Sequence, residues 1–107
     1  QASADDVSIS AEGKRTAIIE KVTSSIVDRI TTVGPQEEME YKIAGQVEKE
    51  LGQKINFTQK KEEKFSFTTI DEDNIKTIKT LSVEDSEFVI RRLTELARQA
   101  ADNNMES

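Results

Sequence analysis

The spacing of apolar residues changes from a helical period to a strand period near Ile55, and it changes back near Val83. Up to Gly52, apolar side chains recur at steps of three and four residues, which places them on one face of a helix. The segments around Phe57 and Phe65 instead alternate apolar and polar residues, as half-buried strands do. These two switches restrict the chain to a fold in which helices flank a short β-segment.

Two helices are expected before the first switch. The first starts after Ser10, a good N-cap residue, and stops before Gly34. The second begins at Pro35, whose missing N–H costs nothing at the first helical position, and it ends at Gly52. Because the corner between the two helices is short, residues 10–52 should form a helical hairpin.

A small antiparallel sheet is expected over residues 54–80. Phe57 should oppose Phe65, and Ile55 should oppose Phe67, so that the apolar side chains share one face. This pairing leaves a loop of three or five residues between the first two strands. The intervening segment contains no glycine or asparagine for a tight left-handed turn, so we expect the five-residue loop.

A third strand and a last helix complete the predicted order. The run from Ile75 to Thr80 is rich in β-branched residues, which favour a strand after the preceding acidic turn. Ser82 and Asp85 form a capping box that starts a helix over residues 82–103. Asn103-Asn104 then break the apolar pattern, and the helix should end there.

Together these elements predict an α+β fold in a single domain over residues 1–107. Its parts are a flexible end at 1–9, the helical hairpin at 10–52, a small antiparallel β-sheet at 54–80 and a C-terminal helix at 82–103. The C-terminal helix should pack on the sheet. Four aromatic residues are expected to form the core between sheet and helix: Phe57, Phe65, Phe67 and Phe88.

The composition removes most catalytic constellations. The chain has no cysteine and no histidine, so it lacks thiolate nucleophiles, the usual general base and the commonest metal ligand. A calcium loop counted from Asp71 would need a glycine at Lys76 and a glutamate at Ser82. We therefore expect no enzyme and no catalytic, cofactor-binding or metal-binding residues. A carboxylate hydrolase would require two of these acidic residues in one cleft: Asp71, Asp73, Glu84 and Asp85.

Charge and hydropathy limit the partners. The net charge is −6, and nucleic-acid affinity comes mainly from lysine and arginine, so we expect no nucleic-acid partner. No run approaches the roughly 20 apolar residues that span a bilayer, so we expect no membrane span. The absence of cysteine suits an exported protein. The first residue is Gln1 and not methionine, which leaves open a leader that precedes this sequence.

The first helix carries an aliphatic face with few large side chains. Apolar residues make up 35% of the chain, which is low for a self-sufficient core. The helix also has a weak Thr-Ser-Ser centre, so it should need packing from outside. We therefore expect a protein partner, most simply a second copy in a homodimer. The predicted contact residues are Ile18, Val22, Ile26 and Ile30.

The second half of the chain has a recognisable order of features. From Ile55 it runs through an apolar-x-Phe strand, a charged loop, a Phe-x-Phe strand and an acidic turn. Ile78-Lys79-x-Leu81 and a capped, acidic helix start then lead on to Leu96. This order resembles that of small FlaG-type flagellar proteins, in which two or three short strands lead into one C-terminal helix. The phrase Val7–Lys14 is also similar to one common in small bacterial flagellar proteins, including anti-sigma factors.

Two positions depart from the FlaG-type pattern. Those proteins usually carry proline before the last helix, where this chain has Ser82-Val83, and often threonine-glycine in the turn, where it has Asp73-Asn74. The resemblance implies an accessory role beside flagellin or the export apparatus, in the bacterial cytoplasm or on an exported flagellum. It brings no catalytic residues. The alternative is an adaptor, chaperone-like protein or inhibitor that binds one protein client.

Overall fold

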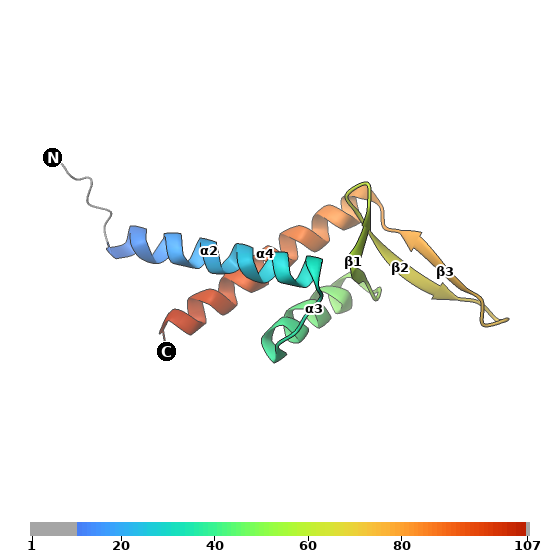
Figure 1. Ribbon diagram of the computed structural model, residues 1–107, viewed down its shortest axis with the longest axis horizontal. Helices are drawn as coiled ribbons and strands as arrows, with labels where there is room; N and C mark the ends of the chain where they lie inside the picture. Colours follow the sequence, from blue (N-terminus) through green and yellow to red (C-terminus); the bar gives the residue numbers. More distant parts are fainter. Residues whose placement is uncertain (1–10, 107) are drawn as a thin grey trace.

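The protein has an α+β fold, seen here in a computed structural model that describes residues 11–106 (Figure 1). The expected flexible end and the N-cap Ser10 lie outside the described residues. The three strands form one antiparallel sheet in the order β1-β2-β3. The elements in chain order are α2 (Ala11–Thr32), α3 (Glu38–Leu51), β1 (Asn56–Lys61), β2 (Lys64–Ile70), β3 (Lys76–Thr80) and α4 (Val83–Glu106).

Glycines end both N-terminal helices, as expected, but α3 begins later than Pro35. Gly34 (φ +91°) and Gly52 (φ +81°) adopt left-handed conformations that a side chain would disfavour. The first residue of α3 is Glu38, because Glu37 acts as its N-cap. The carboxylate of Glu40 accepts the N–H groups of Gln36 (2.8 Å) and Glu37 (3.3 Å), and these bonds fix the helix start there.

The expected five-residue loop between β1 and β2 is wrong, because the strands are joined by a two-residue turn. Glu62 (φ +54°) and Glu63 (φ +65°) both take left-handed conformations without any glycine or asparagine. That is the backbone of a type I′ turn, whose twist suits a hairpin. Lys61 pairs with Lys64 across it. A glutamate pays about 1–2 kcal/mol for each such conformation, so the packing beyond the turn must hold it in place.

An irregularity in β1 reconciles this tight turn with the aromatic packing. Asn56 pairs with Ser66, and the next pair toward the turn joins Lys60 to Phe65. Between these two pairs β1 advances four residues while β2 advances one. Phe65 therefore lies opposite Lys60 and not opposite Phe57. The rings of Phe57 and Phe65 still meet edge to face, with centroids 6.1 Å apart. Both rings thus stay on the core side of the sheet.

Helix α4 connects the helical part to the sheet. It packs mainly on α2 and α3, and its first turns reach β2. The Oγ of Ser82 accepts the N–H of Asp85 (3.0 Å), which confirms Ser82 as the cap. The predicted break at Asn103-Asn104 is wrong, because α4 continues to Glu106. Helix α2 packs along α4 as far as its last turns, where the Nη2 of Arg15 lies 2.6 Å from the Oδ1 of Asp102.

The core lies where α2, α3, α4 and the first two strands converge. Phe57 and Phe65 are buried in it, while Phe67 is half-buried and packs against it. Phe88 is half-buried, and the next residue, Val89, takes the fully buried position on α4. The expected aromatic core is therefore correct for the sheet residues nearest the helices. The remaining core is mostly aliphatic: Ile26, Ile30, Ile43, Ala44, Val47, Ile55, Leu81, Val89, Leu93 and Ala97.

One buried hydrogen bond joins β2 to α4, and its loss should destabilise the protein. The N–H of Phe65 donates to the Oγ of Ser86 (3.1 Å). A Ser86→Ala variant leaves that buried N–H without a partner, which should cost about 1–3 kcal/mol. Urea unfolding followed by circular dichroism measures this loss. The exposed Ser25→Ala on α2 is the control and should change stability by less than about 0.5 kcal/mol; equal losses in both variants would contradict the assignment.

The β2–β3 hairpin extends away from the helices as an arm (Figure 1). Every residue of β3 is exposed, so this strand has no buried face. At the tip, the Oδ1 of Asp71 accepts the N–H groups of Asp73 and Ile75, both at 2.9 Å. Asn74 takes a left-handed conformation in the same turn (φ +62°). The arm contributes to an elongated molecule of 69 × 30 × 21 Å.

Candidate interaction surfaces

The predicted contact face of α2 divides into a buried half and an exposed half. Ile26 (2% exposed) and Ile30 (0%) belong to the core of the monomer. Ile18 (50%) and Val22 (37%) are exposed. The expectation of one continuous partner face is therefore corrected for Ile26 and Ile30, which a partner cannot reach while the monomer is folded. The physical reason is that α2 packs on β1 as well as on α4, and its C-terminal end lies beside β1 (Figure 1).

Ion pairs fix the exposed half of α2 against α4. Glu20 lies 2.9 Å from Arg98, in addition to the Arg15–Asp102 pair. Ile19, between these pairs, is half-buried and lines a hollow shared by the two helices. The side of α2 that faces α4 is thus covered by α4, and Ile18 and Val22 form an exposed aliphatic pair on the same helix.

The arm carries three further exposed isoleucines. Ile70, Ile75 and Ile78 are 61%, 57% and 62% exposed. Ile78 pairs with Thr68, and two residues along each strand Ile70 pairs with Lys76. Because side chains alternate along a strand, Ile70 and Ile78 lie on the same face of the sheet. This face borders a shallow hollow lined by Gln59, Lys60, Lys61, Ser66, Ile78, Lys79 and Thr80.

Sequence reasoning missed this surface, although a signal was present. Ile75 and Ile78 are three residues apart, a spacing that fits a half-buried strand poorly. In the structure β3 has no buried side, so nothing requires the alternation. A segment that is rich in β-branched residues but does not alternate apolar and polar residues can therefore indicate a strand that is exposed on both faces.

The acidic residues are divided between the tip of the arm and the start of α4. Asp71 and Asp73 lie in the turn before β3, and Glu84 and Asp85 lie in the first turn of α4. The extended strand β3 runs between these two groups (Figure 1). Within residues 11–106, no three acidic side chains gather in a way that could hold a metal ion.

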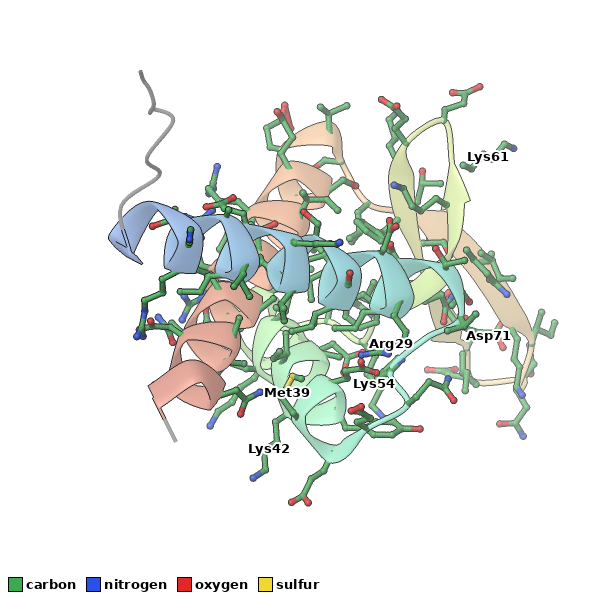
Figure 2. All side chains as sticks on the ribbon, turned by 60° about the vertical axis from the view of Figure 1, so that its left-hand side comes forward. Arg29, Met39, Lys42, Lys54, Lys61 and Asp71 are labelled. Carbon is green, nitrogen blue, oxygen red and sulfur yellow. The ribbon has the colours of Figure 1, made fainter. Side chains whose placement is uncertain are left out.

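The perturbed carboxylates belong to the joints between helices. Burial alone would raise the pKa of Glu40. The N–H groups of Gln36 and Glu37 and the guanidinium of Arg29 outweigh that effect and hold the pKa below its ordinary value. Arg29 extends from α2 toward α3, where its Nε donates to Glu40 (Figure 2). These groups join the last turns of α2 to the start of α3.

A second such joint connects α3 to α4. Arg92 donates two hydrogen bonds to Glu50, from Nε at 2.8 Å and from Nη2 at 3.0 Å. These bonds from Arg92, and then one from Gln46, lower the pKa of the Glu50 carboxyl.

The lysines of the sheet differ from the arginines of the helices. Four helix arginines form ion pairs: Arg15, Arg29, Arg92 and Arg98. The five sheet lysines form none with any residue that the structure describes: Lys60, Lys61, Lys64, Lys76 and Lys79. Lys60 lies 5.2 Å from the ring centre of Phe65, and Lys61 points outward from the hairpin (Figure 2). Lysines are therefore the only charged residues within the three strands, and the acidic residues of this segment lie in the two turns: Glu62, Glu63, Asp71, Glu72 and Asp73.

Comparisons with known proteins give no relative: no family model, no curated protein and no solved structure matches this chain. Within residues 11–106, no helix combines the length and the hydropathy of a membrane-spanning segment.

Proposed function

We propose that this protein is a non-enzymatic protein–protein interaction module and that it contacts its partner through the β2–β3 arm. The observation that carries the proposal is the exposure of Ile70, Ile75 and Ile78 on an arm that extends beyond the helices. Complete burial of one such side chain contributes about 1.5–3 kcal/mol. A partner that covers the three isoleucines therefore gains binding energy that the monomer itself leaves unused.

The biological setting follows from the FlaG-type resemblance, which covers the segment that forms the arm. On that basis we propose an accessory role beside flagellin or the export apparatus of a bacterium. The alternative is an adaptor, chaperone-like protein or inhibitor with one client. An accessory should co-purify with a large assembly, whereas an adaptor should bind its client at a fixed, small stoichiometry.

A comparison of three baits tests the arm. The intact chain, an Ile70→Thr/Ile75→Thr/Ile78→Thr variant and an Ile18→Ser/Val22→Ser variant are used to capture proteins from source-cell extract. The arm variant should capture less than a tenth as much of the specific partner as the intact chain does. The reason is that threonine favours the strand as isoleucine does but offers less apolar contact area. The helix variant should retain it.

The variants also serve as each other's controls. Circular dichroism should show that both fold, since all five replaced side chains are exposed. If the helix variant loses the partner and the arm variant retains it, the contact lies on α2 and the arm proposal is wrong.

A homodimer through α2 is the second candidate. The exposed pair Ile18 and Val22 favours it, although Ile26 and Ile30 are no longer available to it. Light scattering at rising concentration detects such a dimer, and Ile18→Asp should reduce it to monomers. A wild-type chain that stays monomeric throughout removes this candidate.

A further inference from the structure

We infer that the open edge of β3 is a docking site for an extended acidic segment of a partner protein, which adds to the sheet as a fourth strand. This inference rests on the proposed function of the arm. It goes further by naming the mode of contact and the chemistry of the partner.

The edge of β3 is the first part of the argument. In the order β1-β2-β3, β3 pairs with β2 on one side only, and all five of its residues are exposed. The opposite edge strand, β1, lies against α2. An outer strand of this kind presents N–H and C=O groups to which an extended peptide can bond. Among the described strands, β3 is thus the one with an edge clear of the helices (Figure 1).

Charge complementarity selects the occupant. Lys76 and Lys79 lie on β3 itself and form no ion pair within residues 11–106. The hollow beside Ile78 adds Lys60 and Lys61 and has no carboxylate among its lining residues. A strand that carries acidic side chains would place them beside Lys76 and Lys79, while the two lysines of β1 lie farther across the sheet. A basic strand would be repelled from these lysines.

The pairing geometry gives the partner a short sequence pattern. In antiparallel addition, consecutive partner residues lie opposite Lys79, Ile78, Thr77 and Lys76. Carboxylates opposite the two lysines and an apolar residue opposite Ile78 give the order acidic, apolar, any, acidic. Ile78 and Lys76 point to one face of the sheet and Lys79 to the other, so the two carboxylates also lie on opposite faces.

The surroundings of the lysines disfavour other occupants. Asp71–Asp73 at the arm tip and Glu62-Glu63 at the other turn flank the lysines. A nucleic-acid backbone carries a negative charge at every residue and would meet these carboxylates as it runs past both turns. A protein strand with carboxylates only opposite Lys76 and Lys79 keeps its negative charge between the turns. A second copy of β3 is a poor partner because it brings two further lysines and no carboxylate to the same edge.

The test uses the full-length, isotope-labelled protein and the peptide acetyl-STEVTES-amide, which has the predicted pattern. Nuclear magnetic resonance should show shift changes along residues 76–80 and intermolecular contacts between the peptide and β3. The charge-reversed peptide acetyl-STKVTKS-amide should bind at least tenfold more weakly. Added salt should weaken binding of the acidic peptide, because the ion pairs are exposed.

A charge-swapped protein, Lys76→Glu/Lys79→Glu, is the matched variant. Its spectrum should show a preserved fold, since both lysines are exposed. Its affinity for the acidic peptide should be more than tenfold lower than that of the wild type, and its affinity for the basic peptide should be higher. No binding of the acidic peptide at millimolar concentration, or equal binding by both proteins, overturns the inference.

Two further probes decide between occupants. A short oligothymidylate that binds these lysines more tightly than the acidic peptide would overturn the inference in favour of nucleic acid. Shift changes at β3 on concentrating the protein alone would overturn it in favour of self-pairing.

If the Ile→Thr arm variant loses the cellular partner while the peptide does not bind, the proposed function stands and strand addition fails. If that variant keeps the partner, the proposed function itself fails.

Discussion

An Ile26→Asp variant should be largely unfolded at neutral pH, whereas Ile18→Asp on the same helix should fold normally. Ile26 is 2% exposed and lies in the core cluster, so an aspartate there would bury a charge without a partner. Disruption of this kind costs about 3–5 kcal/mol, a large part of the 5–15 kcal/mol that typically stabilises a domain. Ile18 is half exposed, and an aspartate at that position remains in water. Urea unfolding followed by circular dichroism measures the difference.

An Ile26→Val variant separates the effect of charge from that of volume. Removing one methylene should cost only about 0.5–1.5 kcal/mol, so this variant should remain folded. Light scattering of Ile26→Asp and wild type shows whether the substitution changes the oligomeric state. If Ile26→Asp stays folded and merely changes from dimer to monomer, Ile26 contacts a partner and its placement in the monomer core is wrong.

The division of α2 shows what a periodic stripe leaves undetermined. Ile18, Val22, Ile26 and Ile30 are chemically alike, and their spacing places them on one helix face. Which of them is covered depends on where β1 and α4 lie, and those positions are set by contacts distant in sequence. Sequence therefore predicted the helix and its apolar face, but not the point at which the core ends.

The sheet shows the same limit at the level of register. The alternation around Phe57 and Phe65 predicted two strands and their common core face, because that pattern is local. The turn was not predictable from residue preferences, since Glu62 and Glu63 adopt left-handed conformations that glycine or asparagine would favour. The irregular part of β1 compensates for the tight turn and keeps the rings together. Tertiary packing thus decided the loop length.

The low apolar content has a specific structural explanation. An apolar fraction of 35% suggested a thin core, with part of the chain left unpacked or dependent on a partner. The structure concentrates its core among the helices and the adjacent parts of β1 and β2, while β3 is exposed throughout. The composition therefore averages a well-packed part and an arm without a core. An average over the whole chain cannot locate the arm. The spacing of its isoleucines, which do not alternate with polar residues, is a local signal that could have located it.

Replacing Glu40 with alanine should destabilise the protein by about 3 kcal/mol, at the lower end of the range for breaking a buried ion pair. The Glu40 side chain is 0% exposed, and it accepts hydrogen bonds from Gln36, Glu37 and Arg29. Alanine leaves the two N–H groups at the start of α3 without acceptors. The effect stays at the low end because Arg29, which is 43% exposed, can still turn to water. The exposed Glu38→Ala in the same turn is the control and should change stability much less.

Acid should reproduce part of this loss in the wild type. The pKa of Glu40 is lowered in the folded state from the ordinary value of 4.5, so its carboxylate contributes stability fully above that pH. The contribution is then lost as the pH falls below 4.5 through the lower folded pKa. The stability advantage of wild type over Glu40→Gln should therefore be constant near neutral pH and should shrink below 4.5, because glutamine cannot be protonated there. Urea midpoints of both proteins across this range measure the difference. An advantage that grows in acid would mean that burial dominates and that the folded pKa is raised.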